Sequence, residues 1–327
     1  MDHAEDVFDG DIFIYRGGRA PQHVTHALID ETVDDIEENA FKDCVHLVQV
    51  DTHDGIRRVG RAAFWKCRSL QRIVLKSVVE IERSAFYECV NLESAELGDR
   101  LETIGVNAFH GCSSLTHLKL PSIITIGNFA FRYSKRLTDI ELSARLEAIG
   151  AYAFLNCRHL QRIAVPLKRN LLEFFSDLNK RYNQFQYCEE LVTVDLVGGT
   201  YKTVASLHME SWTNEMSAEI NRINQVLPNT PATPDGEKTN VIRRWMHSVL
   251  DKLDYYKAEH IRYVKEGITL LELALWRAKL GEKEDDCTEG KAKKAKIDVE
   301  SKRHERRITC GADIVIKNVL PFLQLDE

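Results

Sequence analysis

Cysteine is the residue in this chain whose type and spacing could do chemistry. It recurs in nearly identical stretches, AFKDCVHL, AFWKCRSL, AFYECVNL, AFHGCSSL and AFLNCRHL, and in AFRYSKRL a serine takes its place. A thiolate can ligate zinc, attack an electrophile or pair as a disulfide, whereas a protonated thiol can pack as a small apolar group. The residues are Cys44, Cys67, Cys89, Cys112 and Cys157, with Ser134 as the exception.

These cysteines belong to a repeat of 22 or 23 residues. The phenylalanine of an Ala-Phe pair stands three residues before each, and a leucine that opens an alternating run such as LQRIVL or LTHLKL stands three after. A polar turn and an Ile-Gly pair, or a variant of it, complete the unit. Several positions held in phase predict a solenoid, because one unit cannot bury its apolar face without its neighbours.

Each unit is expected to supply one short strand with apolar residues at every second position. Roughly one helical or 3₁₀ turn should follow and carry the Ala-Phe-x-x-Cys stretch. The glycine of the Ile-Gly pair is expected to supply a backbone conformation that other residues resist, although Glu82 stands there in one unit.

The unit L-x-x-I-x-L…I-G-x-x-A-F-x-x-C resembles the BspA-like class of leucine-rich repeats over roughly residues 28 to 198. The resemblance implies an α/β repeat fold: a right-handed leucine-rich-repeat solenoid with a concave parallel sheet, followed by an α-helical C-terminal region. The C-terminal half resembles the tails of algal members. Many relatives in this class are surface or adhesion proteins. Two departures are Ser134 and the last unit, QFQYCEELVTVDL, whose phenylalanine follows its predecessor by 31 residues.

The chain is predicted to divide into five parts. These are an N-terminal cap over 1–27, repeats over 28–198 with an insertion at 167–183, a helical tail or cap over 199–280, a charged, flexible segment over 281–310 and an apolar segment over 311–327. Apolar residues recur every three or four positions in 205–227 and from Thr239 to about Leu280, which predicts two helical stretches. These helices either cover the open end of the solenoid or form a coiled coil over 205–280, as a homodimer or with a partner helix.

The arrangement of the cysteines favours packing over chemistry. Stacked side chains point in parallel about 4.8 Å apart, whereas a disulfide needs converging Cβ atoms and zinc needs ligands that close on one point. No repeating histidine could serve as a base. A core ladder is therefore predicted from Phe41, Cys44, Phe64, Cys67, Phe86, Cys89, Phe109, Cys112, Phe131, Phe154 and Cys157.

The sequence contains no HExxH, P-loop, G-x-G-x-x-G after a strand, or G-x-S-x-G motif. The HVTH stretch, His23 to His26, has metal-like spacing, but no cysteine or carboxylate pattern accompanies it, and an N-terminal capping strand with exposed histidines is the prediction. We therefore expect no catalytic, cofactor-binding or metal-binding residues and no enzymatic activity.

If the strand leucines point inward, the residues two and four places after the leading leucine face the concave surface. They are Gln49, Asp51, Arg72, Val74, Ser94, Glu96, His117, Lys119, Asp139, Glu141, Arg162, Ala164, Thr193 and Asp195. Both signs of charge occur, which suits a protein or peptide better than a phosphate backbone. The candidate binding residues are Arg72, Glu96, His117, Lys119, Asp139, Glu141 and Arg162; an ordinary solvated sheet face is the alternative.

The net charge of -6 argues against general affinity for nucleic acid. The basic segment 291–307 is the exception, as a nuclear import signal or an anionic-surface contact. With no apolar run long enough to span a membrane and no signal sequence, we expect an intracellular protein, in the cytoplasm ahead of the nucleus. The predicted function is a non-enzymatic recognition or scaffold module; the alternatives are a nuclear regulatory factor using 291–307 and, disfavoured, a surface adhesion-type protein.

Overall fold

The computed structural model describes residues 7–9, 11–169, 171, 183–197, 210–233 and 237–284. The chain forms two compact units, Met1–Leu253 and Asp254–Glu327. Most of the predicted insertion at 167–183, the basic segment 291–307 and the apolar segment 311–327 lie outside the described residues.

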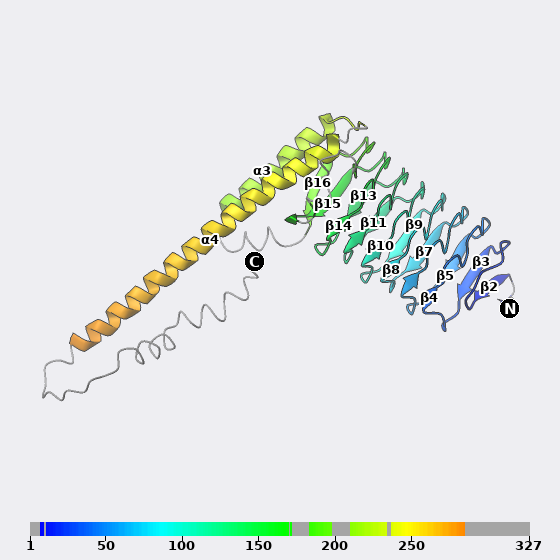
Figure 1. Cartoon of the computed structure of the whole chain (residues 1–327), viewed down its shortest axis with the longest axis horizontal. Coiled ribbons are helices and arrows are strands. Elements are labelled where there is room, and N and C mark those ends of the chain that lie inside the picture. Colours follow the sequence, from blue (N-terminus) through cyan, green and yellow to red (C-terminus); the bar gives the residue numbers. More distant parts are fainter. Residues whose placement is uncertain are drawn as a thin grey trace. The chain divides into compact units, whose positions relative to one another are not determined.

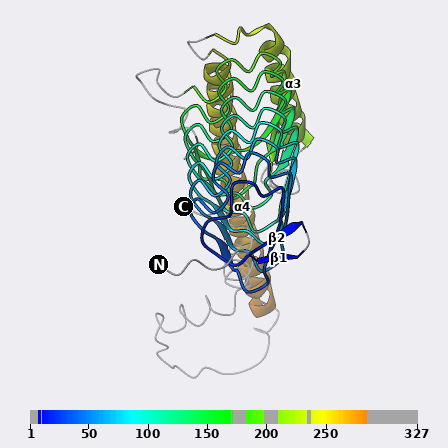
Figure 2. The ribbon, with the colours of Figure 1, turned by 90° about the vertical axis from the view of Figure 1, so that its right-hand side faces the viewer.

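The first unit is a solenoid of stacked coils, seen from the side in Figure 1 and along the stack in Figure 2. Its longer strands form two sheets, and every pairing is parallel except that of β1 with β2. The first sheet holds β1 (Val7–Asp9), β2 (Ile12–Tyr15), β3 (His26–Ile29), β5 (Gln49–Asp51), β7 (Arg72–Leu75) and β9 (Ser94–Leu97). The second holds β11 (His117–Lys119), β13 (Asp139–Glu141), β15 (Arg162–Pro166) and β16 (Thr193–Val197). We call the outer surface of these strands the long-strand face; it is the surface that was expected to be concave.

Six consecutive coils contribute a second strand that the repeat pattern did not predict. The Ile position of the Ile-Gly pair and the residue before it form a six-stranded parallel sheet of two-residue strands. These strands are β4 (Asp35–Ile36), β6 (Arg58–Val59), β8 (Glu80–Ile81), β10 (Thr103–Ile104), β12 (Thr125–Ile126) and β14 (Ala148–Ile149). The prediction of one strand per unit was wrong because a two-residue strand has no alternation to reveal it; pairing with the neighbouring coils creates it.

The Ala-Phe stretch is a run of tight turns, not a helical or 3₁₀ turn. The Cys67 amide donates to the Phe64 carbonyl across 3.2 Å, but Ala62 and Lys66 have φ of 52° and 59°. A left-handed residue stops a right-handed helix from forming. It also turns the Phe64 amide outward, where it donates to the Ala85 carbonyl of the next coil across 2.7 Å. The expected helix is therefore replaced by a third ladder of hydrogen bonds between coils.

The glycine of the Ile-Gly pair is required for a close approach and not for its own backbone conformation. A Cβ on Gly105 would lie 2.6 Å from the Arg83 nitrogen, and one on Gly127 would lie 2.6 Å from the Gly105 carbonyl carbon. Neither glycine has a left-handed φ, so the expectation of an unusual conformation was wrong. The backbones of adjacent coils are too close here for most side chains.

Stacked phenylalanines form the centre of the solenoid. Successive rings from Phe41 to Phe154 lie between 5.0 and 5.4 Å apart at interplanar angles of 10° or less, and Phe185 continues the stack at 5.6 Å. Tyr15 extends it at the other end, with its ring 5.0 Å from that of Phe41. All residues of the predicted core ladder have an exposed fraction of 0%.

Two helices follow the coils: α3 (Glu210–Val226), which runs into the 3₁₀ helix η1 (Leu227–Asn229), and α4 (Glu237–Glu284). Within the first unit they bond to the last coil. Asn224 accepts a hydrogen bond from the Val194 amide at 2.8 Å, and Thr239 accepts one from the Phe185 amide at 3.1 Å. Lys238, which is buried, donates to two carbonyls of the same coil at 2.9 and 2.8 Å. The α4 helix begins two residues before Thr239.

Candidate functional site

The candidate binding residues lie in register on the long-strand face. His117, Asp139, Arg162 and Thr193 are successive partners across four strands, as are Lys119, Glu141, Ala164 and Asp195. Nearer the N-terminus, Gln49, Arg72 and Ser94 are aligned, and Val74 is opposite Glu96. All of these side chains are exposed or half-buried except Ala164, which is buried. Ala164 was expected to be exposed, but its small side chain lies between the in-register Glu141 and Asp195.

Part of the charge on this face is neutralised within the protein. Arg72 pairs with Glu96. Arg162 lies between Asp139, at 3.2 Å, and Asp195, at 3.1 Å. Burial alone would lower the pKa of Arg162, but hydrogen bonds to the two carboxylates outweigh it and raise that pKa. These five residues therefore already satisfy one another.

The middle of the face keeps charges that the described part of the protein does not pair. Lys119 and Glu141 are exposed and in register, yet neither forms an ion pair within the described residues. His117 contacts the Thr138 hydroxyl through Nδ1 at 3.3 Å. One cation, one anion and one imidazole thus stand on adjacent strands, available to a ligand.

An apolar patch on the same face was missing from the sequence prediction. Ile12 is 40% exposed and Leu28 is 42% exposed, and they lie on the paired strands β2 and β3, with the half-buried Ile14 opposite Leu28. The signal was present in the alternation of IFIY and HALI. The predicted cap over 1–27 separates Ile12 from the repeats, whereas β2 belongs to the same sheet as β3.

The cysteines donate hydrogen bonds between coils. Each thiol from Cys67 to Cys188 lies 3.0 to 3.2 Å from the carbonyl oxygen of the phenylalanine one coil earlier. The Ser134 hydroxyl makes the same bond to Phe109 at 3.1 Å. Burial raises the pKa of Cys44 to about 11 and that of Cys188 to about 12, so the thiols stay protonated at neutral pH. The serine is therefore a substitute donor in the same ladder.

A second, shorter row of rings stands at the residue after three consecutive core phenylalanines. Trp65 stacks on Tyr87 at 4.0 Å, and Tyr87 stacks on His110 at 4.6 Å. Burial, with a contribution from Arg132, lowers the pKa of His110 to about 4. The AFW, AFY and AFH triplets carry the signal for this row. A neutral imidazole takes the place of an aromatic ring there.

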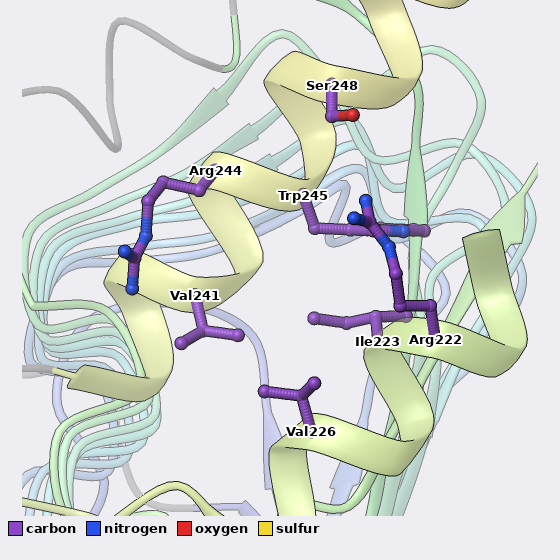
Figure 3. A pocket seen from close by; sticks show the side chains of 7 residues that line it. All are labelled: Arg222, Ile223, Val226, Val241, Arg244, Trp245 and Ser248. Carbon is purple, nitrogen blue, oxygen red and sulfur yellow. The ribbon is translucent and has the colours of Figure 1, made fainter.

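A pocket of about 330 Å³ opens between α3 and α4, within the first unit. Figure 3 shows Val226 and Val241 facing one another across it, with Ile223 and Trp245 beside them. The indole is held in place because its Nε1 donates to the Glu219 carbonyl at 3.0 Å. The walls are mainly apolar, and the lining does not contain a nucleophile paired with a base.

Within the described ranges, histidine, cysteine, aspartate and glutamate do not gather into a group that could hold a metal ion, and this includes the HVTH histidines. Among the described helices, none is long and apolar enough to cross a membrane.

Comparison with known proteins identifies the repeats. A family model described as a BspA type leucine rich repeat region, in six copies, matches residues 21–121 and 79–196. A Treponema pallidum (T. pallidum) leucine rich repeat protein is 25% identical, with 56% of this chain and 73% of that chain covered and a TM-score of 0.38. A leucine-rich repeat protein from Bacteroides ovatus is 20% identical, with 54% of each chain covered and a TM-score of 0.33. A leucine rich cell surface protein from Faecalibacterium prausnitzii is 17% identical, with 65% and 97% covered and a TM-score of 0.22.

No curated protein matches the chain. The TM-scores of these three structures are 0.38 or lower, so the family of this chain is shown by the family model and by the stacked coils. The matched residues cover more than half of the chain and coincide with the stacked coils. Leucine-rich repeat modules are typically binding modules and typically non-catalytic. The chain belongs to the BspA-type leucine-rich repeat family.

Proposed function

We propose that this protein is a non-enzymatic recognition or scaffold module that binds a protein or peptide through its long-strand face. The observation that carries the proposal is the pair Lys119 and Glu141: two exposed, in-register charges of opposite sign that form no ion pair within the described residues, on a face where Arg72 and Arg162 are paired. Stacked repeats create extended surfaces of this kind, and such surfaces are the usual binding sites of solenoid proteins.

The chemistry of the face indicates a protein ligand. A partner would need an acidic group for Lys119 and a basic group for Glu141, and an apolar side chain could cover Ile12 and Leu28. Charged and apolar groups mixed in this way are typical of protein interfaces. A nucleic-acid groove would instead present mainly Lys and Arg along its length.

The test is photo-cross-linking in native cells from a benzoylphenylalanine placed at Ser94, an exposed residue of the long-strand face, which leaves Lys119 and Glu141 intact. Proteins captured from this position should be absent when the probe replaces Lys135, which is exposed but lies in a turn outside the face. A captured protein should then bind the Lys119→Glu, Glu141→Lys double variant about tenfold or more weakly, and the Lys135→Glu variant normally. Capture of the same proteins from both positions, or unchanged binding of the double variant, would contradict the proposal.

The nuclear and adhesion alternatives stay predictions. The nuclear one depends on the basic segment 291–307, which lies outside the described residues. The nuclear alternative is tested by comparing the cellular distribution of a fluorescent fusion of the full chain with that of a fusion lacking residues 290–307.

A further inference from the structure

The distal part of α4 carries apolar side chains in contact with solvent along one face. Leu271 is 49% exposed and Leu275 is 40% exposed, and Ile261, Val264 and Ile268 on the same face are half-buried. By contrast, the apolar residues of α4 in the first unit, such as Trp245, Val249 and Leu253, are buried. A contiguous apolar stripe that is open to solvent on a helix marks an interaction surface more often than free surface.

The apolar residues of distal α4 also follow a heptad. Ile261, Val264, Ile268, Leu271 and Leu275 are separated by three, four, three and four residues within one unbroken helix. This spacing produces a continuous seam, which pairs with another helix by knobs-into-holes packing. The seam runs through the second unit alone, so it does not compete with the contacts that α4 makes to the last coil.

The charges beside the seam select the partner and its direction. Lys265 follows Val264, and Glu272 follows Leu271, at equivalent flanking positions one heptad apart. In an antiparallel pair of identical helices with Ile268 packed against Leu271 of the second copy, each Lys265 lies beside the other copy's Glu272. A shift by one heptad would bring Lys265 against Lys265, and a parallel pair would bring Glu272 against Gly267.

We propose that distal α4 forms an antiparallel coiled coil with a second copy of this chain, in the register that joins Lys265 to Glu272 twice across the two-fold axis. A two-fold interface must be complementary to itself, and the flank formed by Lys265 and Glu272 meets this condition. Pairing with a helix of another protein would not require a self-complementary flank. Gly267 and Ala274 on the opposite flank carry no charge that would oppose this register.

The decisive test uses the full-length chain in analytical ultracentrifugation. The unmodified protein should be a dimer at micromolar concentration. Lys265→Glu and Glu272→Lys should each weaken the dimer about tenfold or more, because both flanking pairs become repulsive. An equimolar mixture of the two variants should dimerise normally, since every flanking pair then joins opposite charges. The double variant should also recover.

Matched substitutions separate the seam from general surface effects. Leu271→Asp should give a monomer, whereas Leu273→Asp, an equally exposed leucine two residues away and off the seam, should stay dimeric. Both variants should keep the thermal unfolding of the coils. With Cys287 and Cys310 replaced by serine, Ile268→Cys mixed with Leu271→Cys should oxidise to a mixed disulfide.

Three results would overturn the inference. A protein that is monomeric at all concentrations would exclude pairing with a second copy. Disulfides formed between identical cysteine variants in preference to mixed ones would show that the helices pair in parallel. Charge reversals that leave dimerisation unchanged would exclude the proposed register.

Discussion

The thiol of Cys112 shows why cysteine recurs in this solenoid. Its position requires a side chain small enough for the space beside the phenylalanine stack and able to donate to the Phe86 carbonyl, which lies 3.1 Å away. Valine meets neither condition and alanine only the first. Serine meets both, and Ser134 occupies the equivalent position in the next coil with the same hydrogen bond. The residue is thus selected for size and donor capacity, not for reactivity.

Substitutions at Cys112 should therefore rank by their ability to donate. Cys112→Ala should lower the free energy of unfolding by about 1 to 2 kcal/mol, through the lost sulfur packing and the lost hydrogen bond. Cys112→Ser should be less damaging than alanine, and Ser134→Cys should be nearly neutral. Equilibrium unfolding in urea measures all three. An alanine variant as stable as the serine variant would show that the bond contributes nothing.

His110 gives a pH dependence at the residue scale. Its pKa is about 4 in the folded protein against 6.5 for the free side chain, so between these values the unfolded chain binds a proton that the folded chain does not. Stability should accordingly be complete above about pH 6.5 and fall as the pH drops toward about 4. Glu88 opposes the shift and Arg132 reinforces it.

The matched variant is His110→Phe, which keeps a ring on Tyr87 but cannot titrate. Its unfolding free energy should decline less than that of the unmodified protein between about pH 7 and pH 5. Parallel declines in the two proteins would assign the acid sensitivity to other groups.

At the element scale, each coil is defined by how closely it approaches its neighbours. The two-residue strands, the left-handed turn residues and the Ile-Gly glycine all exist because the backbones of consecutive coils lie in hydrogen-bonding contact. The positive φ of the turn residues costs conformational energy. The hydrogen bonds that their backbone amides donate to the next coil offset this cost. Backbone contact, more than side-chain type, decides the geometry of the turns.

A glycine pair tests this conclusion. Gly127→Ala should destabilise the solenoid by about 2 kcal/mol or more, because its Cβ would fall 2.6 Å from backbone atoms that cannot move freely. Gly267→Ala, where the added Cβ meets nothing within 4 Å, should instead raise helix stability by about 1 kcal/mol. Circular dichroism during urea unfolding follows both. A Gly127→Ala protein of normal stability would show that the coils can separate.

At the scale of the whole molecule, a stack of coils leaves two ends that need covering. At the first end, β1 pairs antiparallel with β2 along the edge of the sheet. At the other end, Asn224, Lys238 and Thr239 form hydrogen bonds with backbone groups of the last coil, which would otherwise bond to a further coil. We propose that α3 and the first part of α4 act as the C-terminal cap, as terminal repeats require.

Truncation separates capping from assembly. A chain ending at residue 253 should fold cooperatively and remain monomeric, because it retains the cap and lacks the α4 seam. A chain ending at residue 197 should aggregate or unfold at lower temperature, since its last coil is open. Light scattering with thermal unfolding measures both. A soluble, cooperative, monomeric chain 1–197 would contradict the capping role.

The sequence by itself determined the coils, their inward and outward positions and the phenylalanine stack, because these follow from a period that each unit repeats locally. Only the tertiary structure decided that Ala62 and Lys66 adopt left-handed conformations, that the glycines serve close approach and that Arg162 is shared between two aspartates. Each of these depends on an atom about one coil away, which no local pattern specifies. Ala164 shows the same limit: its strand position predicted exposure, but it is buried.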